Sequence, residues 1–170
     1  MELLDLYDDN GKVTGKTIVR GDKSAKVEPT EHIALATIFI ENSEGKFLIQ
    51  KTSKEKGDVF STTGGHVDSG ETPLDTIIRE TKEEIGVGID SDEIEEYGYM
   101  MFDMPLRFIF YVKKDVDVSN LKLQKEEVDY VKYMSVEEIQ DLIQSGQMLK
   151  SHAILFNELL SKLNNKKLKK

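Results

Sequence analysis

The sequence predicts a mixed α/β fold in which a single domain, 1–170, combines a sheet with several helices. Segments rich in β-branched and aromatic residues dominate the first half of the chain, and segments with helical periodicity are interspersed with the later strands. The composition is 38% hydrophobic and 32% charged, with a mean hydropathy of −0.43, which is typical of a folded chain with a buried core.

The first predicted element is a β-hairpin over 1–22. The segments LLDLY and KTIVR flank a turn at Asp9–Gly11, where an Asn-Gly pair favours positive φ. Next, HIALATIFI (32–40) is typical of a well-buried strand, and KFLIQKT (46–52) is the strand after it. Residues 59–63 are expected to be extended and to lead into a glycine loop at 64–65.

The second half alternates between strands and helices. Pro105 divides EYGYMMFDMPLRFIFYVKK into two strands or bends it, and DYVKYM is a further short strand. SVEEIQDLIQSG is a predicted helix with Ser135 as its N-cap and Glu138 completing a capping box. A terminal helix is expected over 151–167.

Charge and cysteine content exclude several classes of protein. The formal net charge of −9 argues against a general nucleic-acid binder, because a phosphate backbone would be repelled. The chain has no cysteine, which excludes disulfides, thiolate metal sites and a cysteine nucleophile. We find no signal-peptide pattern and no apolar stretch of membrane-spanning length, so we expect a cytoplasmic protein.

A strongly capped helix is predicted over 73–85. Thr72 precedes Pro73, and Asp75 stands three residues after the cap, which is a start signal, while Gly86 supplies the stop. At roughly 100° per residue, one side of this helix should pack on a sheet. The residues of that side are Leu74, Ile77, Ile78, Thr81 and Ile85.

The other side of the same helix gathers three acids. Glu80, Glu83 and Glu84 stand at i, i+3 and i+4, where like charges repel one another. A solvated acidic face is one interpretation. The other is a divalent-cation site, because carboxylate oxygens suit the hard cations Mg²⁺ and Mn²⁺.

The spacing of glycines and charges favours the cation-site interpretation. The segment 64–87 resembles the Nudix box, the signature of Nudix hydrolases, at seven fixed positions: Gly65, Glu71, Arg79, Glu80, Glu83, Glu84 and Gly86. Thr81 departs from the pattern, because the family usually has an aliphatic residue there. The resemblance implies a mixed sheet sandwiched between helices and cleavage of a diphosphate linked to another moiety.

The resemblance also implies roles for the box residues. Glu80, Glu83 and Glu84 would bind Mg²⁺ or Mn²⁺, and the backbone carbonyl of Gly64 or Gly65 would add a ligand. Arg79 would hold a helix glutamate in place, and Glu71 and Gly86 would support the box structurally.

The sequence does not decide which residue is the general base. Many Nudix enzymes take it from a late loop before a short strand, which makes Glu126 and Glu127 candidates, and Glu83 or Glu84 is the alternative. Tyr97, Tyr99, Phe102 and Phe108 are candidates for stacking on a base, although core packing is the favoured role. The expected partner is a small-molecule diphosphate, and the oligomeric state is open.

A second resemblance points to the branch that contains isopentenyl-diphosphate isomerase. It rests on the N-terminal hairpin, the strand EHIALATIFI, the GGH at 64–66 and the EEV at 126–128. His32 and His66 match histidine positions of that branch, and His66 is the better candidate for substrate binding. Gly64 stands where the isomerase has cysteine, so isomerase-like chemistry is an alternative, as is a non-catalytic ligand-sensing module.

Overall fold

The computed structural model describes residues 2–168. Its strands are β1 (Leu3–Tyr7), β2 (Val13–Val19), β3 (Ala34–Glu41), β4 (Phe47–Thr52), β5 (Phe60–Ser61), β6 (Gly64–His66), β7 (Glu95–Met101), β8 (Leu106–Lys113) and β9 (Val128–Met134). The helices are α1 (Pro73–Ile85), α2 (Val136–Gln144) and α3 (Lys150–Leu168). None of the helices described is long and apolar enough to cross a membrane.

The main sheet has seven strands and mixed direction, which confirms the predicted fold class. Its order is β5-β4-β3-β8-β7, while β6 pairs with β3 and β9 pairs with β4. The central pair, β3 and β8, is parallel over eight residues on each strand, and the other pairs are antiparallel. Of the predicted 59–63 strand, only Phe60–Ser61 is paired as β5.

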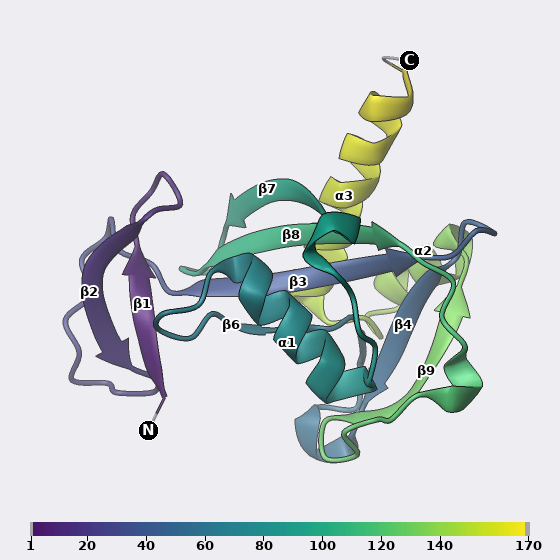
Figure 1. Cartoon of the computed structure of the whole chain (residues 1–170), viewed down its shortest axis with the longest axis horizontal. Coiled ribbons are helices and arrows are strands. Elements are labelled where there is room, and N and C mark those ends of the chain that lie inside the picture. The colour runs from purple at the N-terminus through teal and green to yellow at the C-terminus, as the bar shows by residue number, and fades with distance from the viewer. Residues whose placement is uncertain (1, 169–170) are drawn as a thin grey trace.

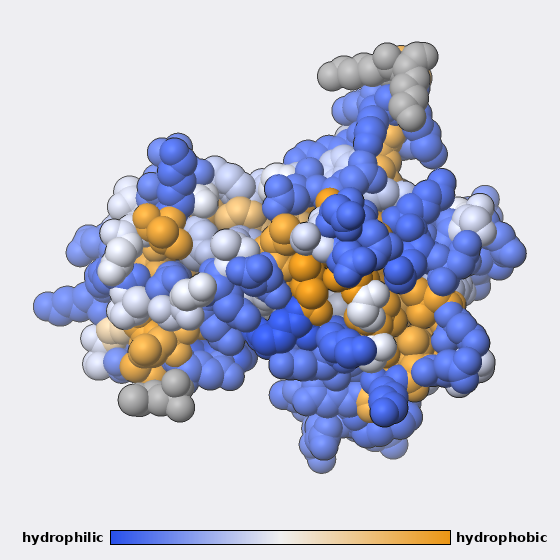
Figure 2. Space-filling view, viewed as in Figure 1, coloured by the Kyte–Doolittle hydropathy of each residue, from blue (hydrophilic) through white to orange (hydrophobic). Residues whose placement is uncertain are grey.

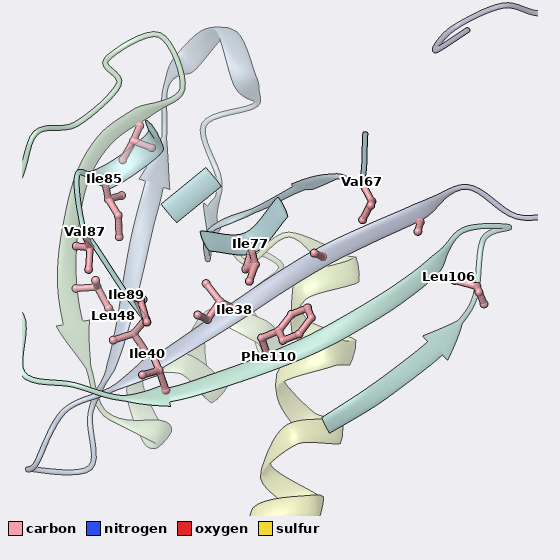
Figure 3. Close-up of a cluster of buried hydrophobic side chains, with 14 of the residues drawn as sticks. Ile38, Ile40, Leu48, Val67, Ile77, Ile85, Val87, Ile89, Leu106 and Phe110 are labelled. Carbon is pink, nitrogen blue, oxygen red and sulfur yellow. The ribbon is translucent and has the colours of Figure 1, made fainter. Parts of the chain in front are cut away.

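Helices cover both faces of this sheet (Figure 1). On one face, Ile77 and Ile85 of α1 pack with alternate residues of β3 and β8, such as Ile38 and Phe110 (Figure 3). On the other face, Phe156 of α3 contributes to a separate cluster with residues of β3, β4 and α2. The sheet therefore separates two apolar cores, as strand alternation requires.

The N-terminal hairpin forms its own two-stranded sheet beside the main one (Figure 1). Leu4, Leu6 and Tyr7 of β1 are buried. His32 fixes the hairpin to the body: its Nε2 lies 2.6 Å from an Asp9 carboxylate oxygen and its Nδ1 3.0 Å from the Met104 carbonyl oxygen. The structure thus gives His32 a connecting role away from the cavity described below.

The structure corrects several details of the predicted elements. The glycine pair is not a loop, because Gly64 and Gly65 form β6 and pair with Thr37 and Ala36 of β3. The buried strand begins at Ala34, two residues later than predicted. The terminal helix is Lys150–Leu168. Pro105 does separate two strands, β7 and β8.

Candidate active site

The acidic helix α1 begins and ends where the sequence predicts. The Thr72 hydroxyl accepts a hydrogen bond from the Asp75 backbone N–H at 3.1 Å, and the Asp75 carboxylate accepts one from the Thr72 N–H at 3.1 Å. At the other end, Gly86 has a φ of 74°, which favours glycine. The two caps fix the register of the helix, and hence the directions of its side chains.

The apolar face of α1 is close to the predicted one. Ile77, Thr81 and Ile85 are buried, and the Thr81 hydroxyl donates to the Ile77 carbonyl at 2.6 Å. Threonine therefore replaces an aliphatic residue here without leaving its hydroxyl unpaired. The prediction was wrong for Ile78, which is only partly buried and lies outside the two core clusters, whereas Thr76 is fully buried.

Arg79 connects the carboxylates of the box. Its Nε donates to one oxygen of Glu71 at 2.8 Å and its Nη2 to the other at 2.9 Å, which is a bidentate pair. Its Nη1 contacts Glu80 and Glu83, each at 3.1 Å, and its Nη2 also contacts Asp68 at 3.2 Å. The bonds to Glu71, followed by the charges of Glu80, Glu71 and Glu83, raise the pKa of Arg79. The guanidinium is thus held by four carboxylates.

Gly65 leaves room for the carboxylate of Glu80. A Cβ atom added at Gly65 would lie 2.7 Å from the Glu80 Cδ. The neighbouring Gly64 is equally crowded, because its Cβ would lie 2.8 Å from the Ala36 carbonyl oxygen. Glycine is therefore required at Gly64, where the close atom belongs to the backbone, whereas a side chain at Gly65 would force the Glu80 carboxylate to move.

Glu84 is the buried member of the acidic trio. Its side chain lies against β4, where Gln50 Nε2 approaches its Oε1 at 3.5 Å, and its Oε2 is buried without a hydrogen-bond partner. Burial, and next the charge of Glu80, raise the pKa of Glu84 to about 8. Helical spacing alone placed this acid with Glu80 and Glu83 away from the sheet, and the structure corrects that.

These residues fit a divalent cation, although they do not form a complete cage. Among residues 2–168, no group of three carboxylate or imidazole side chains converges closely enough to hold a metal ion. Glu80 and Glu84 are close enough to affect each other's pKa, while Glu83 is 52% exposed and turned toward Arg79. The unpartnered oxygen of Glu84 beside a second carboxylate is the arrangement that a hard cation would stabilise.

The late loop brings one of its two acids to this site. The Gln124 backbone N–H donates to the Glu84 carbonyl at 2.8 Å, which ties the loop to the end of α1. Glu127 lines the adjoining cavity, and its carboxylate lies 3.3 Å from the Lys56 ammonium. Glu126 is exposed, and only its backbone carbonyl is engaged, by the Ser53 hydroxyl at 2.7 Å.

A cavity of about 660 Å³ joins these groups. It is bordered by the acids of α1, by Glu127 and by polar residues of β3, β4 and β6. The face of the molecule shown in Figure 2 is largely hydrophilic, with smaller hydrophobic patches. His66 lines it, as the resemblance implies, and burial, followed by the charge of Arg20, lowers the pKa of this histidine. Tyr97, Tyr99, Phe102 and Phe108 are not among its lining residues.

The sequence patterns did not single out several of the lining residues, among them Gln50, Arg107 and His152. Gln50 and Arg107 are polar residues within otherwise apolar strand segments, FLIQKT and LRFIFYVK, which was a visible signal. His152 lies in the first turn of α3, and its Nδ1 accepts a hydrogen bond from the Thr62 N–H at 3.1 Å. Burial lowers the pKa of His152 to about 4.

The site thus combines a mixed sheet between helices, a capped acidic helix and an arginine that holds the carboxylates of that helix. The family model of the NUDIX domain matches residues 31–155, and the chain belongs to the Nudix family. It is therefore a Nudix-type enzyme, a pyrophosphatase.

Two kinds of relative agree with this assignment. An uncharacterized Nudix hydrolase of Listeria monocytogenes is 34% identical over 88% of this chain and 89% of its own length. The crystal structure of the DR0079 protein from Deinococcus radiodurans has a TM-score of 0.74 at 20% identity, covering 92% of this chain and 98% of that one.

A further structural neighbour carries a metal ion. It is a bifunctional NMN adenylyltransferase/ADP ribose pyrophosphatase from Francisella tularensis, complexed with AMP and a Mn ion. Its TM-score is 0.59 at 17% identity, over 77% of this chain and 42% of that one. At these identities the two structures show the fold alone.

Proposed function

We propose that this protein is a Mg²⁺- or Mn²⁺-dependent hydrolase of a diphosphate bond in a nucleoside diphosphate linked to another moiety, or in a related small-molecule diphosphate. The observation that carries the proposal is the buried, unpartnered Oε2 of Glu84 beside Glu80. A buried carboxylate beside a second, partly buried one is costly alone and is stabilised by a dication.

The residues of α1 have separate proposed roles in cation binding and in positioning. Glu80, Glu83 and Glu84 would hold the cation, together with the backbone carbonyl of Gly64 or Gly65. When bound, the cation neutralises the charge of the phosphate oxygens and so favours attack by water. Arg79 is a positioning residue, because its contacts fix Glu80 and Glu83 rather than the substrate.

The remaining roles concern proton transfer and binding. Glu127 lines the cavity and is free of α1, so it is the proposed general base for the attacking water, with Glu83 or Glu84 as the alternative. His66 lines the cavity and is the proposed contact for the substrate. Glu71 supports Arg79 through two hydrogen bonds, and Gly86 ends the helix beside the late loop.

The structure offers an argument against isomerase-like chemistry. The chain has no cysteine, and the place that cysteine takes in the isomerase branch is Gly64. A side chain there would meet the Ala36 carbonyl at 2.8 Å. A non-catalytic binding module is disfavoured because all the box acids are present. The expected cytoplasmic location and the absence of a nucleic-acid partner stay predictions.

The direct test is a screen for phosphate and pyrophosphate release. Nucleoside diphosphate derivatives and non-nucleotide diphosphates are incubated with Mg²⁺, with Mn²⁺ and in metal-free buffer. Release that depends on the cation supports the proposal. Hydrolysis that persists at the same rate without any cation, or enzymatic conversion of isopentenyl diphosphate to its dimethylallyl isomer, would overturn it.

A further inference from the structure

Arg107 in β8 is a cation without an anionic partner. The chain contains three arginines: Arg20 pairs with Glu2 at 2.8 Å, and Arg79 pairs with four carboxylates. Arg107 enters no ion pair among the described residues 2–168, and its Nε is buried without a hydrogen-bond partner. A poorly solvated charge without a partner lowers the stability of the folded protein, so the position of Arg107 in a cavity wall needs a physical reason.

The register of the sheet places Arg107 on the far side of β3 from the acids. Arg107 pairs with Leu35 on one edge of β3, and His66 of β6 pairs with the same Leu35 on the other edge. Strands β6 and β4, against which Glu80 and Glu84 lie, are both on the His66 side. The backbones of Arg107 and His66 are therefore two strand spacings apart, about 10 Å.

An aromatic ring fixes the guanidinium on that far side. The Arg107 guanidinium carbon lies 4.4 Å from the centroid of Phe102, which follows β7. This stacking accounts for the orientation of the side chain, but an aromatic ring is not a hydrogen-bond partner in the plane of the guanidinium, so its N–H groups are left without acceptors there. Arg107 still lines the cavity, so those donors remain available to a ligand.

The groups around Arg107 do not supply it with an anionic partner, because the Glu2 carboxylate that lines the cavity is already paired with Arg20 at 2.8 Å. Arg20, His66 and His152 line the same part of the cavity, and the charge of Arg107 contributes to the lowered pKa of both histidines. The charge of Asp103 acts on Arg107 from a distance, without an ion pair. The cavity is thus polarised, with the carboxylates of α1 at one end and the unpaired cation Arg107 at the other.

We infer that Arg107 is a substrate-binding residue that takes an anionic oxygen group, a phosphate or a carboxylate, on the substrate moiety remote from the scissile diphosphate. This inference rests on the proposed function, since it requires that the cavity be the substrate site. A planar guanidinium binds either group through two parallel hydrogen bonds. The substrate class is then a diphosphate whose second moiety carries its own negative charge about two strand spacings away.

The test follows the arginine side chains directly. Because the chain has only three arginines, their Nε–H signals in a nitrogen-15 NMR spectrum can be assigned with Arg20→Lys, Arg79→Lys and Arg107→Lys. Inorganic phosphate is titrated into metal-free protein in one arm and acetate in the other. We expect the Arg107 signal to shift and to saturate, with a dissociation constant on the order of 1 mM for the preferred anion. The anion that binds more tightly shows whether the site takes a phosphate or a carboxylate group.

Matched variants separate binding at Arg107 from general charge effects. Arg107→Gln should weaken saturable anion binding at least tenfold, while Lys113→Gln, at the exposed end of the same strand, should leave it unchanged. Saturation of the Arg20 signal alone, or an Arg107 signal that neither anion moves, would overturn the inference.

A Mn²⁺ titration of the same proteins tests the proposed function separately. Arg107→Gln should bind Mn²⁺ as the parent does, which also shows that the variant is folded. Failure of the parent protein to bind Mn²⁺ would count against the proposed function, whereas failure of the anion titration alone would count against Arg107.

Discussion

At the scale of single residues, the site depends on a few contacts that spacing alone does not reveal. Arg79 was expected to hold one glutamate, and it contacts Glu71, Glu80 and Glu83 together. Glu84 was expected on an open face, and it is buried against Gln50. Both features come from neighbours on other elements, so helical geometry could not supply them.

Glu127 and Glu126 are neighbouring glutamates of which only Glu127 lines the cavity, so substituting each in turn tests the proposed general base. Glu127→Gln should lower kcat by roughly 10²–10⁴-fold with little change in KM, because the lost proton transfer belongs to the transition state. Glu126→Gln should leave kcat near the parental value, since that side chain is exposed and outside the cavity. Steady-state kinetics on the substrate found in the screen checks this. Parental kcat in both variants would move the base to Glu83 or Glu84.

Gly65 tests the fit between β6 and Glu80. In Gly65→Ala the new Cβ would lie 2.7 Å from Glu80 Cδ, so the carboxylate must move. We expect Mn²⁺ affinity to fall by roughly 10–100-fold, with an unfolding free energy lower by about 1–3 kcal/mol. Gly88→Ala is the control, because nothing lies within 4 Å of a Cβ there and its change should stay within about 1 kcal/mol. Equal Mn²⁺ affinity in both variants would contradict the packing argument.

At the scale of elements, local signals were sufficient for most of the helices. The capping boxes at Thr72 and Ser135 fix the starts of α1 and α2 where the sequence predicts them. The glycine pair was harder, because Gly64 and Gly65 indicate a loop locally and become a strand only through pairing with β3. Tertiary contact outweighs local preference at that position.

The first turn of α3 should make stability depend on pH. Burial lowers the pKa of His152 from an ordinary 6.5 to about 4, so the unfolded chain binds this proton more readily than the folded one. The contribution of neutral His152 to the free energy of unfolding is therefore fully present above about pH 6.5. It decreases by up to about 3 kcal/mol as the pH drops toward 4.

His152→Asn is the variant that tests this. Asparagine can still accept from the Thr62 N–H but does not titrate, so the loss of unfolding free energy between pH 6.5 and 4 should be smaller than in the parent. Chemical denaturation at several pH values measures it. Identical pH slopes in the two proteins would show that His152 is not the group responsible.

At the scale of the whole molecule, the sequence predicts the fold class and the composition of the site but not their arrangement. The box spacing indicates the family, and through it the mixed sheet. The polarised cavity arises because β3 lies between β8 and β6, which brings Arg107 and His66 into one row. Such long-range pairing depends on the register of distant strands, and no local pattern encodes it.

The position of the N-terminal hairpin could not be predicted from local sequence patterns either. Its turn at Gly11, with a φ of 76°, agrees with the predicted Asn-Gly turn. Its position beside the main sheet is set by the contacts of His32 with Asp9 and Met104, which lie far apart in the sequence. That position brings Arg20 to the cavity, so the hairpin contributes to the site as well as to the fold.

The central claim is that the carboxylates of α1 bind the cation on which hydrolysis depends, and it is tested most directly by calorimetric titration of Mn²⁺ without substrate. The parent protein is compared with Glu83→Gln and Glu84→Gln, whose melting temperatures in metal-free buffer check that they fold. The account predicts clear binding by the parent and affinity at least tenfold weaker in both variants, since each loses a charged oxygen ligand. Unchanged Mn²⁺ affinity in both variants would contradict it.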